Sequence, residues 1–212
     1  MGSTKKLDLY KTFAGDYAAS RTPAIVETHG AQYLAIEGQG EPGGPVFGTR
    51  LGLLYNVAFT IKMAKKFAGV DYAVCKLEGL WWGRAKEGTS FLDEPRSQWH
   101  WQLLIRTPDF IKASDRNAAL SQLEKRGKDP AVADVKLMRL DEGRSIQMLH
   151  VGPYDTEPES LDRMHALAQT LGLLPHRLHH EIYLSDPRRV PAARLKTILR
   201  MPVRAGQAAP FT

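Results

Sequence analysis

The sequence predicts an α+β fold in which two β-α-β-β units, related by duplication, form one antiparallel sheet with helices on a face. The first observation is that YLAIEGQGEPGGP at 33–45 resembles MLHVGPYDTEP at 148–158, each giving a strand, a glycine and an acidic loop with proline. The second is that both segments lead into helices with the same spacing of apolar residues. Each helix is followed by a strand that carries a glutamate, Glu78 in one half and Glu181 in the other. Such self-similarity is the sequence signature of a repeated unit.

The first half of the chain supplies two strands and then a helix. Strand-forming residues between turn residues predict strands at 24–27 and 32–37. Apolar residues at i, i+3, i+4, i+7 and i+10 predict a helix that ends near 68–69. Its apolar face comprises Leu51, Leu54, Tyr55, Ala58 and Ile61. The remaining predicted elements of this half are a hairpin-like pair at 71–77 and 79–82 and a strand at 98–106.

The second half begins with a helix for which Ser114 is the predicted N-cap, running to about 126–127. Strands at 135–140 and 145–150 are joined by DEGR, a good turn sequence. A second helix ends at Gly172, and its predicted apolar face comprises Leu161, Met164, His165, Ala168 and Leu171. The last predicted elements are HHEIYL at 179–184, stopped by Pro187, and a final strand at 196–203.

These elements fit a single domain at 23–205, made of pseudo-repeats at about 23–110 and 111–205. We expect residues 1–22, which are polar, to be a loosely attached N-terminal arm, and residues 206–212 to be a C-terminal tail. A cleft is expected at the joint between the two repeats.

Composition places the chain among ordinary globular proteins, with 43% hydrophobic and 25% charged residues. The one cysteine, Cys75, excludes an intrachain disulfide framework and fits a reducing cytoplasm. No apolar run is long enough for a signal peptide or a membrane span. We therefore expect a cytoplasmic protein without a membrane partner.

The net charge of +6 raises the question of nucleic acid, yet acidic residues are scattered throughout and no nucleic-acid-binding motif is readable. We expect no direct binding to nucleic acid. A metal site is also not expected, because the neighbours His179 and His180 point apart on a strand and no HExxH motif is present.

Three short strings carry the functional signal: LEGLWW at 77–82, QWHW at 98–101 and HHEIYL at 179–184. The first two hold all four tryptophans, Trp81, Trp82, Trp99 and Trp101. Tryptophan offers a large flat apolar face with one hydrogen-bond donor. A buried carboxylate among such faces is costly unless it is paired or functional. Together the strings predict a concave aromatic pocket with an acid in it, fit for a small planar aromatic or electrophilic molecule.

Strand alternation groups the candidate residues by face. Glu181 shares a face with Tyr183, and Glu78 shares one with Trp82 if its strand is regular. Trp99 and Trp101 fall in register with apolar residues, so one of the two is expected to pack under the pocket. The alternative for Glu181 is an ion pair with an arginine on an exposed face of the sheet.

Five segments, in this order, resemble the GyrI-like small-molecule-binding proteins. They are LEGLWW, the Trp-His-Trp strand leading to TPDF at 107–110, HVGPYD at 150–155, HHEIYLSDPRR at 179–189 and LKTILRMPV at 195–203. The resemblance spans about residues 5–203. As an ordered set these motifs are specific, whereas each alone is weak.

The resemblance implies the GyrI-like effector-binding fold, which also occurs in drug-responsive transcription regulators and in the SOUL haem-binding family. The segment before the domain is too short to be a helix-turn-helix, so the chain is similar to stand-alone members. Stand-alone members of this type resemble hydrolases that open the cyclopropane of DNA-alkylating cyclopropanoids, the duocarmycin and yatakemycin class. The expected activity is therefore cofactor-independent hydrolysis that detoxifies such drugs and confers drug resistance.

By position, the family's pocket glutamate matches Glu181, its aromatic residues match the four tryptophans, and the tyrosine after its second Gly-Pro matches Tyr154. We expect Glu181 to deprotonate a water as general base. We expect Tyr183 or Tyr154 to hydrogen-bond the oxygen on which charge develops. Glu78 and His150 complete the expected ligand-binding residues.

Other functions stay open. A binding-only protein would sequester drugs in the same pocket, and a protein-binding module of the gyrase-inhibitor kind would present a surface without a deep cavity. A haem binder would need an exposed axial histidine, for which His150 and His165 are the candidates, although His165 falls on a predicted core face. A homodimer is also left open.

Overall fold

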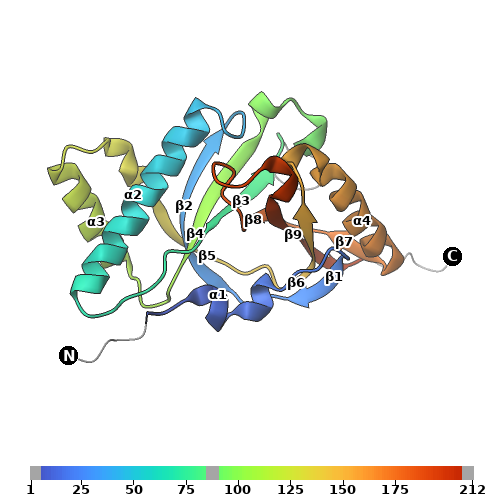
Figure 1. Cartoon of the computed structure of the whole chain (residues 1–212), viewed down its shortest axis with the longest axis horizontal. Coiled ribbons are helices and arrows are strands. Elements are labelled where there is room, and N and C mark those ends of the chain that lie inside the picture. The colour runs from blue at the N-terminus through green and yellow to red at the C-terminus, as the bar shows by residue number, and fades with distance from the viewer. Residues whose placement is uncertain (1–5, 85–90, 207–212) are drawn as a thin grey trace.

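The computed structural model describes residues 6–84 and 91–206. Residues 1–5, 85–90 and 207–212 lie outside this description, and with them most of the expected C-terminal tail. The described strands form one antiparallel sheet in the order β1-β6-β9-β8-β3-β4-β2-β5, and β7 pairs with β9 (Figure 1). Together with the helices, this is the α+β architecture that the sequence predicts.

The strands are β1 (Ala24–Glu27), β2 (Ala31–Gln39), β3 (Leu77–Trp82), β4 (His100–Thr107), β5 (Lys136–Leu140), β6 (Arg144–Val151), β7 (Leu173–Pro175), β8 (His179–Tyr183) and β9 (Lys196–Ala205). The α-helices are α1 (Leu9–Thr12), α2 (Pro45–Phe67), α3 (Ala113–Lys125) and α4 (Glu157–Thr170). Short 3-10 turns used below are η1 (Ala14–Tyr17), η3 (Arg96–Gln98) and η5 (Tyr154–Thr156). No helix in the part of the chain described here is long and apolar enough to cross a membrane.

The two β-α-β-β units meet at the middle of the sheet. One is β2-α2-β3-β4 and the other is β6-α4-β8-β9, and they lie in the sheet as β6-β9-β8 beside β3-β4-β2. At the joint β3 pairs antiparallel with β8, so that Gly79 is opposite Glu181 and Trp81 is opposite His179. Residues directly opposite each other on paired strands share a face of the sheet. The joint therefore brings the tryptophan string beside the acidic string.

Helices α2 and α4 cover the same face of this sheet. The core under α2 includes Leu103, and the core under α4 includes Leu199. Leu103 lies opposite Gly79 on β3, and Leu199 lies opposite Glu181 on β8, so the two cores share a face with Glu181. Helix α2 starts with Pro45 in its first turn, where proline loses no hydrogen bond, and Gly69 with φ +86° follows its end.

The predicted hairpin-like pair at 71–77 and 79–82 is wrong, and the two strands joined by DEGR do not pair with each other. Residues 77–82 form one strand that pairs with β4 and β8, whereas 71–76 make only an isolated bridge between Leu7 and Tyr72. Strands β5 and β6 are both present, but β5 pairs with β2 and β6 pairs with β9 and β1. The DEGR segment therefore crosses from one part of the sheet to another.

Helix ends also differ in detail from the prediction. Helix α3 begins at Ala113, where Asp115 Oδ2 accepts a hydrogen bond from the Lys112 backbone N–H at 2.9 Å, so Ser114 lies inside the first turn. The three-residue strand β7 was not expected. His165 is exposed on α4 and does not belong to its buried face.

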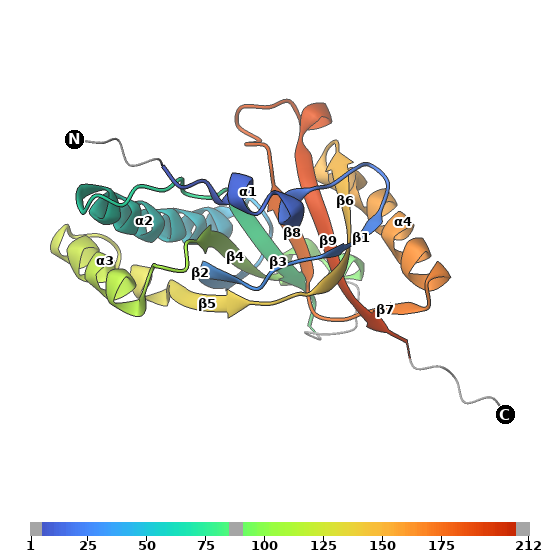
Figure 2. The same ribbon diagram turned by 90° about the horizontal axis from the view of Figure 1, so that it is seen from below.

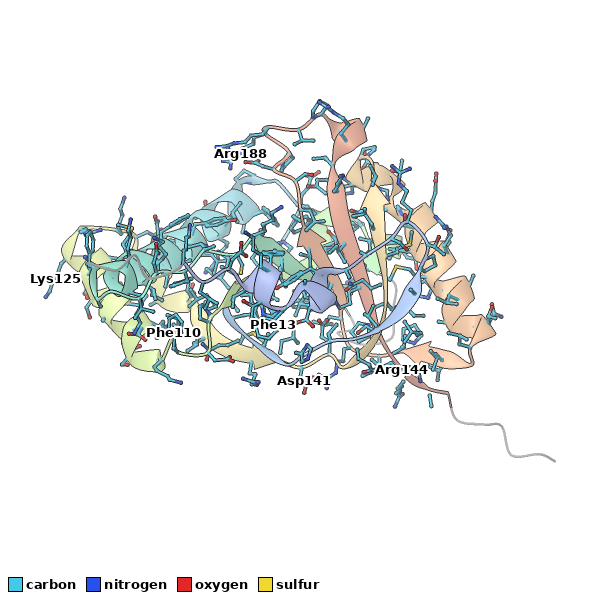
Figure 3. The ribbon with its side chains drawn as sticks, turned by 60° about the horizontal axis from the view of Figure 1, so that its bottom comes forward. Phe13, Phe110, Lys125, Asp141, Arg144 and Arg188 are labelled. Carbon is cyan, nitrogen blue, oxygen red and sulfur yellow. The ribbon has the colours of Figure 1, made fainter. Side chains whose placement is uncertain are left out.

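The N-terminal segment is not loosely attached from residue 7 onward. Leu9 is buried in the core under α2, whereas Asp16 is buried on the opposite face of the sheet. Figure 2 shows α1 beside the strands, and Figure 3 shows Phe13 directly after it. The carboxylate of Asp16 pairs with Arg106 at 2.9 Å, and Arg106 also lies 4.2 Å from the ring centre of Phe13. Backbone carbonyls of Asp16 and Ala18 accept hydrogen bonds from Gln147. Polar groups of this segment thus form an ion pair and hydrogen bonds with buried residues of the sheet. Composition alone cannot predict such pairs.

A buried charge network lies on this second face of the sheet. The ring of His180 is between two carboxylates, with Nδ1 2.9 Å from Glu142 and Nε2 3.0 Å from Glu78. Glu142 also accepts from Arg200 at 2.8 Å. Burial disfavours the charged forms of Glu142 and His180. The charges of His180 and Arg200 nevertheless lower the pKa of Glu142 to about 2. Glu142 and Glu78 raise the pKa of His180 to about 9 against the effect of its burial.

Folding stability is therefore expected to fall at both ends of the pH range. The raised pKa of His180 stabilises the fold fully below its ordinary value of 6.5, and this is lost as pH rises through about 9. The lowered pKa of Glu142 stabilises it above 4.5, and this is lost as pH falls toward about 2. Thermal unfolding followed by circular dichroism should show the highest Tm between pH 4.5 and 6.5. A Tm that stays level from pH 6.5 to 9 would contradict a charged His180.

Candidate functional site

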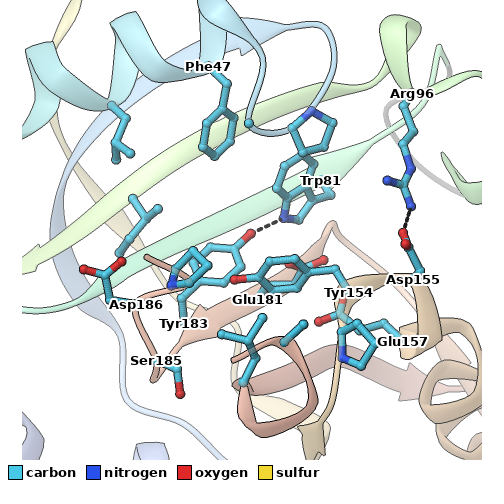
Figure 4. Close-up of a pocket in the computed structure, with 18 of the residues that line it drawn as sticks. Phe47, Trp81, Arg96, Tyr154, Asp155, Glu157, Glu181, Tyr183, Ser185 and Asp186 are labelled. Atoms are coloured by element: carbon cyan, nitrogen blue, oxygen red, sulfur yellow. Dashed lines mark hydrogen bonds and ion pairs between the residues drawn. The ribbon is translucent and has the colours of Figure 1, made fainter. Parts of the chain in front are cut away.

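A cavity of about 880 Å³ opens between the two repeats, on the face covered by α2 and α4. Both repeats line it, and seven aromatic side chains contribute: Phe47, Tyr55, Trp81, Phe91, Trp99, Tyr154 and Tyr183. Figure 4 shows Trp81 and Tyr183 near its centre and Glu181 beside Tyr154. The volume is within the range of small-molecule sites.

Gly79 allows the two strands at the joint to bring their aromatic groups together. A Cβ at this position would lie 3.0 Å from Trp81 Nε1 and 3.2 Å from Tyr183 Oη. With glycine there, Trp81 Nε1 donates a hydrogen bond to Tyr183 Oη at 3.1 Å. The side chain missing at Gly79 is thus what lets an indole of one repeat bond a phenol of the other.

Trp81 organises the aromatic wall of the cavity. Its ring stacks with Phe47 at 6.2 Å and with Phe91 at 6.4 Å, and it meets Trp99 edge to face at 6.0 Å. Phe91 in turn stacks on His179 at 5.7 Å. Stacked and edge-to-face pairs at these distances are the favourable arrangements of aromatic rings. The wall presents flat apolar surface to a ligand.

Glu181 is the carboxylate of β8 that faces the cavity, and 7% of its surface is exposed. Its Oε1 lies 3.4 Å from His179 Nε2. Tyr183, two residues along the same face, also lines the cavity, and the charge of Glu181 adds to the effect of burial in raising its pKa. Glu181 and Tyr183 therefore line the cavity together, as predicted, and the alternative of an ion pair between Glu181 and an arginine on an exposed face is not observed.

Glu157, at the start of α4, is a second buried carboxyl in this cavity, and the sequence analysis missed it. It is also 7% exposed, and its Oε1 has no hydrogen-bond partner among the residues described. Burial and the nearby charge of Glu181 raise its pKa well above the ordinary value, outweighing the opposite effect of the Thr197 hydroxyl. The sequence feature that could have identified Glu157 is its position in the acidic loop before the helix, because both repeats carry such a loop.

Two of the tyrosines that line the cavity, Tyr154 and Tyr183, are neutral hydrogen-bonding groups. Burial raises the pKa of Tyr154 to about 12, with Glu157 and Glu181 adding to the effect. Burial and Glu181 raise the pKa of Tyr183 further above its ordinary value. Their rings meet edge to face at 6.0 Å. Both phenols therefore keep their protons at neutral pH.

Not every predicted ligand-binding residue lines the cavity. Trp99 and Trp81 do, whereas Trp101 is fully buried in the core, where Gly38 leaves room for its ring and Gly40 accepts its Nε1 hydrogen bond at 3.0 Å. This matches the expectation that one tryptophan of QWHW packs under the pocket.

Glu78, Trp82 and His150 are placed away from the cavity. Glu78 and Trp82 share a face as expected, but it is the opposite face, where Glu78 belongs to the network with His180. Trp82 stacks on His100 at 5.8 Å. His150 is buried, and its ring bonds Ser160 at 3.0 Å and the carbonyl of Pro153 at 3.2 Å, which fixes the turn leading into α4. The pairing of β3 with β8 puts Glu78 and Trp82 on the face of the sheet opposite to Glu181.

Among residues 6–84 and 91–206, no group of three or more His, Cys, Asp or Glu side chains is placed to hold a metal ion. At the mouth of the cavity, charges are paired with each other: Arg96 with Asp155, and Arg188 with Asp186 at 3.0 Å.

Comparisons with known proteins agree with this geometry. A sequence profile described as the GyrI-like small molecule binding domain matches residues 21–204. A conserved protein from Listeria innocua, of uncharacterized function, is 36% identical, with a TM-score of 0.86 over 94% of this chain and 100% of that chain. A hydrolase from Listeria innocua is 35% identical, with a TM-score of 0.83 over the same shares. The C-terminal domain of EcmrR, 11% identical with a TM-score of 0.55 over 87% of this chain and 98% of that one, shares the fold alone. A search of curated proteins found no match.

Proposed function

Because the chain belongs to the GyrI-like small-molecule-binding family, we propose that its cavity binds a flat aromatic electrophile and hydrolyses it, with cyclopropanoid drugs as the substrate class. The relative from Listeria innocua that is a hydrolase supports an enzymatic reading, since the two chains align over nearly their whole lengths. The proposal extends to drug detoxification and to a cytoplasmic setting.

The observation that carries the proposal is a buried carboxylate set against an aromatic wall. Glu181 lies 3.4 Å from the ring of His179 on its own strand and shares the cavity with Tyr183. A site that only buried an apolar drug would gain nothing from desolvating this carboxylate. A positioned base inside a cavity is what activation of a water molecule requires.

In the proposed reaction the aromatic wall stacks on the planar ring system, and Glu181 takes a proton from a water next to the strained carbon. The water oxygen bonds to that carbon, a ring carbon–carbon bond breaks, and its electron pair moves to the conjugated carbonyl oxygen. Tyr183 accepts a hydrogen bond from Trp81 Nε1, which holds its phenol on the same face of β8 as the base. Tyr154, at the cavity wall, is placed to donate to the ligand. Strain release drives the step, so acid-base help of ~10²–10⁴-fold suffices.

The rival function is sequestration of a drug without chemistry. Buried carboxylates also neutralise bound cations, so Glu181 could serve a cationic drug in the same cavity. The two functions differ in stoichiometry: a hydrolase acts below one equivalent and leaves a hydrated ring-opened product, whereas a sequestering protein returns its drug unchanged.

Mass spectrometry of a mixture of limiting protein and excess cyclopropanoid distinguishes them. We expect many equivalents of drug to gain the mass of one water, at a rate well above that with heat-denatured protein. Recovery of intact drug in stoichiometric complex, with several electrophiles of different structure, would contradict the hydrolase and leave binding as the function.

Stacking on the wall predicts a contrast between two tryptophans. Trp99 lines the cavity, and Trp82 faces the opposite side of the sheet, so W99A is expected to weaken binding of a planar aromatic drug by ~1–3 kcal/mol and W82A to leave it unchanged. Titration calorimetry measures both. Equal affinities of wild type and W99A would place the ligand elsewhere.

A further inference from the structure

We infer that Glu157 is the proton donor of this site and works with Glu181: it gives its proton to the ligand oxygen on which negative charge develops, while Glu181 receives the proton of the attacking water. This inference rests on the proposed hydrolysis and adds an acid to its base. It also assigns a purpose to the second carboxyl of the cavity, which drug stacking and water activation leave unused.

The position of Glu157 places it at the reacting region. It is the first residue of α4 and follows the η5 turn that carries Tyr154, so the two side chains reach the cavity from one short segment. Figure 4 shows Glu157 on the same side of the cavity as Tyr154 and Glu181. Oε1 is buried without a hydrogen-bond partner among the residues described, so it is available to a ligand.

The charges around Glu157 favour its protonated form. Glu181 on β8, Tyr154 and Asp155 on η5, Arg96 on η3 and the Thr197 hydroxyl on β9 are the groups that act on it. Arg96 is the cation among them, but its side chain is 50% exposed and pairs with Asp155. The helix N-terminus favours a carboxylate, by about 0.3–1 kcal/mol in exposed cases. Burial and the charge of Glu181 outweigh both, and they raise the pKa of Glu157.

A raised carboxyl pKa suits the transfer better than the phenols do. Proton donors are most effective when their pKa lies near the working pH. Tyr154, with a pKa of about 12, remains a hydrogen-bond donor, and the pKa of Tyr183, which accepts from Trp81, is raised further. Two carboxyls whose surroundings differ in this way form a base and an acid in one site.

The proton balance closes within the pair. Water loses one proton to Glu181 and its oxygen bonds to the strained carbon, while the broken ring bond supplies electrons to the carbonyl oxygen. Glu157 protonates that oxygen, which gives a phenol. Transfer of the proton on Glu181 to Glu157, directly or through solvent water, restores both groups, and the net change is addition of one water.

The test compares E157Q with E159Q, since Glu159 is an exposed glutamate on the same helix. We expect E157Q to lower kcat for a cyclopropanoid on the order of 10²-fold, because the amide keeps the shape but supplies no acidic proton. E159Q should leave kcat unchanged. Binding of the hydrolysed product, measured by calorimetry, should stay within a few-fold in both variants, which separates chemistry from folding and affinity.

Two further measurements, of kcat against pH and against the acidity of the product phenol, would show no effect of E157Q if Glu157 were merely structural. The wild-type kcat should decline as pH rises through the pKa of Glu157, and this decline should disappear in E157Q. With cyclopropanoids that give more acidic phenols, the loss in E157Q should shrink, because their oxygen needs less help from an acid. Wild-type kcat in E157Q, or a loss independent of phenol acidity, would overturn the role of Glu157 alone. Absence of turnover in the wild-type protein would instead overturn the hydrolase function itself.

Discussion

Replacing Glu181 with glutamine is expected to lower the turnover of a cyclopropanoid by ~10²-fold or more, because the amide keeps the shape of the side chain and cannot accept the water's proton. The loss should appear in kcat, since the base acts on the water and not on the drug. Affinity for the hydrolysed product should change little. Steady-state kinetics with the purified variant, together with calorimetry for the product, measure the two effects separately.

Glu37 provides the matched control for this prediction. It is also a strand glutamate, on β2, but it is exposed and accepts a hydrogen bond from Gln102 at 3.0 Å. E37Q should therefore turn over the drug like the wild-type protein. Undiminished turnover in E181Q would show that Glu181 is not the base, and an equal loss in E37Q would point to a general effect on the fold.

The largest effect on stability is expected from H180Q. His180 is fully buried between Glu142 and Glu78, and the glutamine leaves both carboxylates without their shared cation. Removal of one partner from a buried ion pair typically costs about 3–5 kcal/mol. Chemical denaturation should show a loss of this order in the free energy of unfolding, and the pH dependence above 6.5 should weaken.

The control is H165Q, a histidine exposed on α4, which should change the free energy of unfolding by less than about 0.5 kcal/mol. If H180Q is as stable as H165Q, the network with Glu142 and Glu78 does not hold a charged imidazole. Because His180 and Glu181 are neighbours on β8 with opposite faces, H180Q is also a test of how firmly that strand positions the base.

The sequence was informative about the fold because its duplicated pattern is local. Each strand, glycine, acidic loop and helix is readable within a short window, and the family resemblance orders them. The pairing of β5 and β6 was not readable, because a turn sequence such as DEGR reports only local geometry, whereas the partners of a strand are set by the whole sheet. The burial of the N-terminal segment was not predicted for a related reason. An aspartate such as Asp16 is expected to be solvated, and only the tertiary structure shows that Arg106 lies beside it.

The site was predicted in part for similar physical reasons. Alternation along β8 correctly paired Glu181 with Tyr183, since the register of a single strand needs no partner. For β3, alternation grouped Glu78 with Trp82 but could not say which face the cavity occupies, because both faces of this sheet are covered. Glu157 was missed because an acid in the first turn of a helix ordinarily serves the helix dipole. Only the tertiary structure places it beside Glu181.

A single turnover in water labelled with heavy oxygen tests the central claim most directly, that Glu181 activates a water which adds to the strained carbon. With protein in excess over a cyclopropanoid, the account predicts that the label appears in the ring-opened product in the first turnover and that Glu181 stays unlabelled, as mass spectrometry of product and peptides would show. An unlabelled product with label in the peptide carrying Glu181 would contradict it, since the carboxylate itself would then have attacked the ring.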